Sequence, residues 1–142
     1  MIIIYMEGII YGDMGFKQYK ASYHILICNG SSCNRAGAEE LTQAIRKEIS
    51  NRELDDTLHT TRTKCNGRCH DKCVVIDYPK GTWYKDLKPE EASLFVNSLL
   101  ASKGYTEKVS HTFHDKGFQC SLGVVTGILK DKEKVSKVSK IL

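Results

Sequence analysis

The chain has 142 residues, of which 41% are hydrophobic and 27% charged, with a formal net charge of +4 at pH 7. This composition is that of one globular domain, and the sequence contains no repeats, heptads or phosphate-binding glycine motif. The apolar start, residues 1–6, is too short to cross a membrane and lacks the basic residues and cleavage site of an export signal. We therefore expect a cytoplasmic protein that has no membrane partner and keeps its cysteines reduced.

Beyond residue 22, apolar patterns indicate alternating strands and helices. The run at 23–28 is short and apolar, which predicts a buried strand that leads into a Gly- and Ser-rich loop. Apolar residues recur at helical spacing between 36 and 50, which predicts a helix there. The later elements are predicted strands at 57–63, 74–78 and 82–84 and a helix from Pro89 to Gly104. This order is typical of an α/β or α+β sandwich with a thioredoxin-like fold, in which helices flank a mixed sheet.

The two ends of the chain carry less information. We expect residues 1–22 to be a leader, 23–104 to be the domain, and 105–142 to be a C-terminal extension. Two interpretations of the leader stay open: an upstream start site, since Met14 is an equally natural start, and an arm without fixed structure. Within the extension, the apolar residues Phe113 and Phe118 and those at 124–129 together suggest one or two added strands. From Lys103 onward there are eight lysines against four acidic residues, which predicts a basic tail. A solvated surface explains such a tail better than a docking site does.

Four of the six cysteines form two close pairs. Cys28 and Cys33 are spaced as C-x4-C, and Cys65 and Cys69 as C-x3-C. Gly and Asn residues inside each pair permit tight, left-handed backbone geometry, so we expect each pair to lie in a loop that follows a strand. Four thiolates in two local pairs are the donor set of a tetrahedral sulfur site, which zinc or an iron–sulfur cluster would occupy.

The cysteine spacing favours an iron–sulfur cluster and leaves other interpretations open. Zinc ribbons usually have at least one C-x2-C pair, disulfides need an oxidising compartment, and a thioredoxin-type dithiol catalyst needs a C-x-x-C motif. His70 follows Cys69 directly, but adjacent side chains point differently, so we interpret it as a surface residue and not as part of a nucleophilic pair. Trp83 and Tyr84 suggest packing residues of a hairpin, and we expect no nucleic-acid partner.

Basic residues surround the cysteines in the sequence, namely Arg35, Arg62, Lys64, Arg68 and Lys72. Positive charges near a thiol lower its pKa and would help to hold four thiolates together. Those that face water would instead steer an acidic partner toward the site. For any one of these residues, an ordinary solvated position is the simpler interpretation.

The cysteine pairs and the sequence that follows them resemble the thioredoxin-like [2Fe–2S] ferredoxins. This family includes small free-standing ferredoxins and the equivalent subunit of respiratory NADH dehydrogenase and related hydrogenases. The resemblance covers residues 23–100 and rests on the cysteine spacing, on the string Y-P-K-G-T-W-Y at 78–84 and on L-K-P-E-E at 87–91. It implies a thioredoxin-like fold.

The resemblance also implies a function. A [2Fe–2S] cluster would be bound by the four paired cysteines, Cys28, Cys33, Cys65 and Cys69. The protein would carry single electrons to or from a partner oxidoreductase, without catalysis of its own, and would frequently form a homodimer. We expect its redox partner to present an acidic docking surface. Two alternatives stay open: a zinc-stabilised thioredoxin-like interaction module, and a dedicated accessory protein of a cofactor-biosynthesis enzyme.

The sequence departs from the family pattern near the last ligand. Lys72 and Cys73 stand where the family usually has Gly-Pro, which adds a fifth thiol to this region. Because a free cysteine packs as a small hydrophobic residue, we expect Cys73 to be buried and inert, and not an alternative ligand. Cys120 lies beyond the resemblance and is expected to be a structural or surface thiol. Asp77 interrupts an apolar strand, which suggests that one face of the hairpin is wet.

Overall fold

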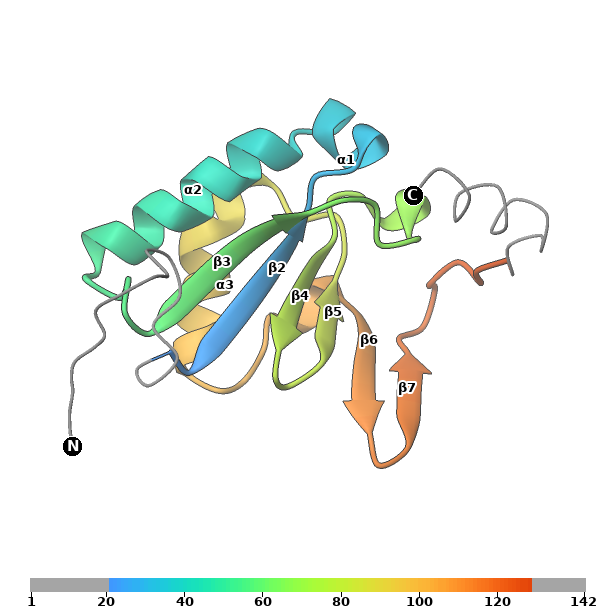
Figure 1. The fold of residues 1–142 in the computed structure, drawn as a ribbon. Helices are drawn as coiled ribbons and strands as arrows, with labels where there is room; N and C mark the ends of the chain where they lie inside the picture. Colours follow the sequence, from blue (N-terminus) through green and yellow to red (C-terminus); the bar gives the residue numbers. More distant parts are fainter. Residues whose placement is uncertain (1–20, 129–142) are drawn as a thin grey trace, which may run out of the picture.

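A six-stranded mixed sheet is the frame of residues 21–128, the part of the chain that this computed structural model describes (Figure 1). The strands are β2 (Tyr23–Cys28), β3 (Leu58–Thr63), β4 (Val75–Tyr78), β5 (Thr82–Tyr84), β6 (Val109–His114) and β7 (Gly117–Cys120). Their order in space is β3-β2-β4-β5-β6-β7. Strands β2 and β3 run parallel, and the other neighbours run antiparallel. The four predicted strands are therefore confirmed.

Two helices, α2 (Ala38–Asn51) and α3 (Ala92–Leu100), cover one face of this sheet (Figure 1). Helix α2 buries Leu41, Ile45 and Ile49, whose four-residue spacing places them on one stripe. From the sheet, Ile25 and Ile27 of β2 are fully buried, and burying each such side chain contributes about 1.5–3 kcal/mol. The α/β sandwich predicted from the order of elements is confirmed. No helix within residues 21–128 has the length and hydropathy needed to cross a membrane.

The helix predicted over 36–50 is preceded by a separate helical turn, α1 (Ser31–Arg35). Gly37 has a φ of 102°, and this left-handed conformation separates α1 from α2. Cys33 therefore lies on a helix, whereas we expected it in a loop. Gly, Ser and Asn residues are common both in loops and at helix N-termini, so composition did not distinguish the two.

Beyond α3, the hairpin of β6 and β7 is added to the edge of the sheet at β5. Phe113 and Phe118 pair across this hairpin with ring centroids 5.1 Å apart. Residues 124–128 form no strand, contrary to the expectation for that stretch. The predicted leader falls almost entirely on residues 1–20, and five of the eight lysines of the predicted basic tail fall on residues 129–142; both stretches lie outside the described residues. The proposed domain boundaries therefore stay a prediction.

Asp77 contradicts the expectation of a wet hairpin face. Its side chain is 2% exposed and lies on the same side of β4 as Val75, toward the helices. It lines a small cavity with Tyr84 near the end of α3, and its Oδ1 has no hydrogen-bond partner within residues 21–128. The exposed face of β4 carries Tyr78 instead, because side chains alternate along a strand. Burial raises the pKa of the Asp77 carboxyl, and Lys80 partly opposes this rise.

Replacing Asp77 with Asn is expected to stabilise the fold at neutral pH. The raised pKa means that the folded chain binds the proton more tightly than the unfolded chain, in which the ordinary value of 3.8 applies. Stability is therefore lost as the pH rises above that value, until the pH passes the folded-state pKa. Because Asn carries no charge, Asp77→Asn should raise the free energy of unfolding by about 1–3 kcal/mol at pH 8.

Urea unfolding at pH 5 and at pH 8 measures this effect. The increase in the free energy of unfolding caused by Asp77→Asn should be at least as large at pH 8 as at pH 5, because Asp77 ionises more completely at the higher pH. Asp55→Asn is a suitable control, because it makes the same substitution at an exposed residue. If Asp77→Asn is no more stable than the original protein at pH 8, or is stabilised more at pH 5 than at pH 8, the raised pKa assigned to Asp77 is wrong.

Candidate metal centre

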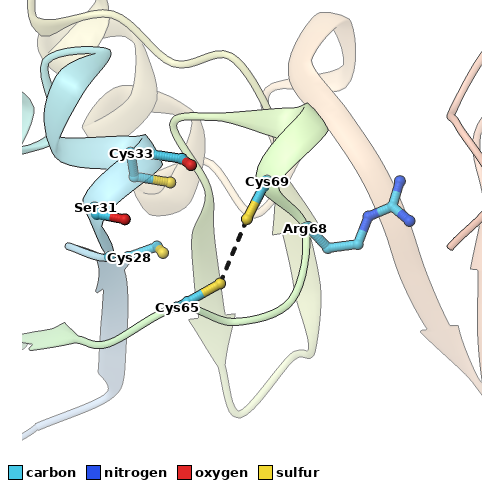
Figure 2. A pocket seen from close by; sticks show the side chains of 8 residues that line it. Cys28, Ser31, Cys33, Cys65, Arg68 and Cys69 are labelled. Carbon is cyan, nitrogen blue, oxygen red and sulfur yellow. Dashed lines mark hydrogen bonds between the residues drawn. The ribbon is translucent and has the colours of Figure 1, made fainter. Parts of the chain in front are cut away.

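The four paired cysteines meet at one end of the sheet. Strand β2 ends at Cys28, and the parallel strand β3 places Thr63 beside it, so the segments that leave the two strands start as neighbours. The first segment carries Cys33 on α1, and the second carries Cys65 and Cys69. All four cysteines line a single cavity (Figure 2). Sites in α/β proteins commonly form here, beyond the carboxyl ends of parallel strands.

The sulfur atoms of Cys65 and Cys69 are spaced to share one metal. Their Sγ atoms lie 3.6 Å apart (Figure 2). Two thiolates on one tetrahedral metal, each with a bond of about 2.3 Å, are separated by roughly 3.8 Å. The backbone N–H of Gly67 donates to Cys65 Sγ at 3.3 Å, so the loop directs a backbone donor at this sulfur. Gly67 has a φ of 85°, and this left-handed conformation lets the loop turn tightly around the sulfur.

The other pair, Cys28 and Cys33, is buried, and the two thiols interact with each other. Burial raises the pKa of Cys33 to about 12; a hydrogen bond with the backbone of Val74 opposes this rise, and the Cys28 thiol adds to it. At neutral pH the Cys33 thiol therefore keeps its proton unless a cation compensates the negative charge. Metal binding at this position must release a proton, as is general for thiolate sites.

The two cysteine segments approach each other at Gly30. A Cβ atom on Gly30 would lie 3.0 Å from the N, Cα and Cβ atoms of Cys65. Carbon atoms in favourable contact are about 3.5–4.0 Å apart, so this approach needs a residue without a side chain. The φ of Gly30 is −66°, so the requirement is steric and not conformational. This contact brings both cysteine pairs to the same cavity.

The donor set fits a two-iron cluster. Within residues 21–128, no three His, Cys, Asp or Glu side chains gather closely enough to hold a single ion. A [2Fe–2S] cluster needs four thiolates, two on each iron, and the cysteines lie as two pairs around one cavity. The two cysteine pairs that are close in the sequence are therefore also two pairs in space.

The remaining cysteines, Cys73 and Cys120, do not line this cavity. Cys73 is 1% exposed, and its Sγ lies 3.6 Å from the carbonyl oxygen of Cys33 and 3.7 Å from that of Ala36. It packs beneath α1, as expected for a small buried residue. Cys120 is exposed on β7, and His70 is exposed beside the ligand loop, both in line with the sequence interpretation.

Of the five basic residues noted in the sequence, four are exposed: Arg35, Arg62, Lys64 and Lys72. The fifth, Arg68, is only partly exposed. Figure 2 shows that its side chain points away from the sulfur atoms. Its Nε donates to Asp71 Oδ2 at 2.7 Å, so its charge is compensated by a carboxylate. The sequence reasoning missed Asp71, although its spacing of three residues from Arg68 was a signal for such a pair. It also missed Ser31 and Ser32, which line the cavity.

Comparison with known proteins shows the family to which this chain belongs. The chain matches the sequence model of one family, described as thioredoxin-like [2Fe–2S] ferredoxin, over residues 8–100. It is 48% identical over 97 residues to a protein of Priestia megaterium named as a 2Fe–2S ferredoxin, a match that covers 68% of this chain and 76% of that protein. It is 36% identical over 70 residues to a 2Fe–2S ferredoxin of Aquifex aeolicus, a match that covers 49% of this chain and 63% of that protein.

Solved structures agree with the sequence match. A thioredoxin-like [2Fe–2S] ferredoxin from Aquifex aeolicus has a TM-score of 0.60 and 27% identity to this chain, and the match covers 67% of this chain and 96% of that one. The family match ends at residue 100, before the hairpin of β6 and β7. Because it spans more than half of the sequence, this chain belongs to the thioredoxin-like [2Fe–2S] ferredoxin family and has the thioredoxin-like fold.

Proposed function

We propose that this chain is a ferredoxin that carries single electrons to or from a partner oxidoreductase. It would bind one [2Fe–2S] cluster through Cys28, Cys33, Cys65 and Cys69. The observation that carries the proposal is the single cavity at the ends of β2 and β3, which all four thiols line. When bound, the cluster supplies a one-electron couple. The cofactor in the names of the relatives from Priestia and Aquifex supports the same assignment.

The two cysteine pairs are buried to different extents, so one side of the site is more accessible to a partner than the other. Cys28 and Cys33 are 2% and 3% exposed, whereas Cys65 and Cys69 are exposed. A partner protein would therefore approach most closely on the side of the second pair. The N–H group of Gly67 lies on this side, and its donation to Cys65 Sγ stabilises additional negative charge there.

The four exposed basic residues support an acidic docking partner. Arg35 follows the first cysteine pair, Lys64 and Lys72 flank the second, and Arg62 lies near the end of β3. A cluster of positive charges accelerates the encounter with a negatively charged surface, and this acceleration falls as salt is added. The partner would then be an oxidoreductase with an acidic patch around its own redox centre.

The proposal assigns no catalysis to this chain. The four thiols that line the cavity would be engaged as ligands, which leaves them unavailable as nucleophiles. All six cysteines are free thiols, which suits a reducing compartment such as the cytoplasm. A homodimer and a dedicated accessory role in cofactor biosynthesis are both compatible with this site.

The deciding experiment is a visible spectrum of anaerobically purified protein together with iron, sulfide and zinc analysis. We expect a coloured protein with about two irons and two sulfides per chain. Colourless protein that contains one zinc per chain and takes up no iron after anaerobic reconstitution would overturn the proposal. That result would leave a zinc-stabilised interaction module in its place.

A further inference from the structure

The segment after the last strand returns to the ligand loop. Strand β7 ends at Cys120, and the N–H of Ser121 donates to the carbonyl of Ser110 at 2.9 Å. Gly123 follows with a φ of 82°, in a turn that leads to Val125. We refer to residues 121–128 as the strap. The strap lies outside residues 8–100, the part of the chain that the family model matches.

Arg68 joins the strap to the loop that carries Cys65 and Cys69. Its Nη2 donates to the carbonyl oxygen of Val125 at 2.5 Å, across 57 positions of sequence. A Cβ atom on Gly127 would lie 3.2 Å from Arg68 Nη1, so the strap backbone packs directly against the guanidinium. Figure 2 shows this side chain leaving the loop on the side opposite to the sulfur atoms.

Asp71 binds the same guanidinium from within the cysteine-bearing segment itself. Its carboxylate accepts from Arg68 Nε, and its backbone N–H donates to the Arg68 carbonyl at 2.9 Å. The side chains of Arg68 and Asp71 are only 14% and 6% exposed. Breaking so buried a pair leaves an uncompensated charge, so the pair holds its geometry firmly. The backbone next to Cys69 is therefore held by Asp71 within the loop and by the strap outside it.

We propose that the strap is a positioning element of the metal site. By docking on Arg68, it holds the loop of Cys65 and Cys69 in the conformation that retains the cluster. Arg68 is then a positioning residue that acts on the site through the loop backbone. This inference rests on the proposed function, because it concerns retention of the proposed cluster.

Two variants distinguish the effect of the strap on the metal site from the effect of the ion pair between Arg68 and Asp71. Arg68→Ala removes both the strap contact and the Asp71 pair. Gly127→Gln leaves Arg68 and Asp71 in place but inserts a side chain where the strap meets the guanidinium. The matched control is Gly117→Gln, because a Cβ atom on Gly117 meets nothing within 4 Å.

Two measurements report on each variant. The rate of thermolysin cleavage before Val124 and Val125, followed by mass spectrometry, reports strap release, and the decay of visible absorbance in the presence of an iron chelator reports cluster loss. A hydrogen bond from a charged donor is worth enough that its loss should increase strap cleavage about tenfold. We expect both Arg68→Ala and Gly127→Gln to accelerate cleavage and iron release, and Gly117→Gln to leave both unchanged.

The outcomes are distinct. Faster iron release in Arg68→Ala alone, with normal release in Gly127→Gln, would assign the effect to the Asp71 pair and overturn the role of the strap. Unchanged strap cleavage in both variants would overturn the docking itself. Cleavage is also measured on metal-free protein, so a chain that binds no iron would refute the proposed function while the docking of the strap is decided separately.

Discussion

Replacing any one of Cys28, Cys33, Cys65 or Cys69 with alanine should lower the iron content from about two per chain to well below one and abolish the visible spectrum. Each variant removes one of four thiolates, and the other residues that line the cavity offer no sulfur in exchange. Those residues are Gly30, Ser31, Ser32 and Arg68. Absorbance, iron and sulfide are measured after anaerobic reconstitution, so that loss during purification is not mistaken for loss of a ligand.

The two remaining cysteines are internal controls for this experiment. Cys120→Ala alters an exposed residue and should change neither the cluster nor the stability. Cys73→Ala removes a buried sulfur and should cost about 1 kcal/mol of folding stability while the iron content stays complete. Iron loss in Cys73→Ala together with iron retention in Cys33→Ala would transfer the ligand role to Cys73. The position of Cys73 beside the Cys33 carbonyl makes this a meaningful comparison.

Local sequence signals were sufficient for the elements that deliver the ligands. The apolar run of β2 begins and ends where it was expected, at Tyr23 and Cys28, because a buried strand next to a Gly- and Ser-rich stretch has a clear boundary. The hairpin of β4 and β5 follows from a Pro- and Gly-containing turn between two β-prone runs. The cysteine spacing then placed four thiols near the ends of two strands, which parallel pairing of β2 and β3 brings together.

Features that depend on distant contacts were not predictable in this way. Asp77 was interpreted as solvent-facing because acidic residues usually are, yet it is buried and lines a cavity with residues of α3, and the sequence around Asp77 carries no signal for that contact. The partner of Arg68 in the strap lies 57 positions away, and its contact is with a backbone carbonyl, which has no residue-specific signal. Gly30 carried a signal for a turn, but its function is to let Cys65 approach, and that can be recognised only in three dimensions.

Gly30 should therefore be among the most sensitive positions in the chain. Gly30→Ala places a Cβ atom 3.0 Å from three atoms of Cys65, and the two segments must move apart to accept it. Overpacking of this kind costs about 1–3 kcal/mol. We expect slower cluster assembly and faster iron release to a chelator in Gly30→Ala, and no stable two-iron cluster in Gly30→Val. Visible absorbance and iron content measure both effects.

The same substitutions at Gly117 test whether the effect is local. Gly117 lies in β7, and a Cβ atom added there meets nothing within 4 Å, so Gly117→Ala and Gly117→Val should keep the full iron content. Circular dichroism of all four variants should be unchanged, since Gly30 lies outside the core and its φ of −66° suits any residue. A Gly30→Val protein that retains two irons with normal release would show that the two cysteine segments need not touch. A graded loss from Gly to Ala to Val, with the fold intact, would instead tie cluster retention to the distance between Gly30 and Cys65.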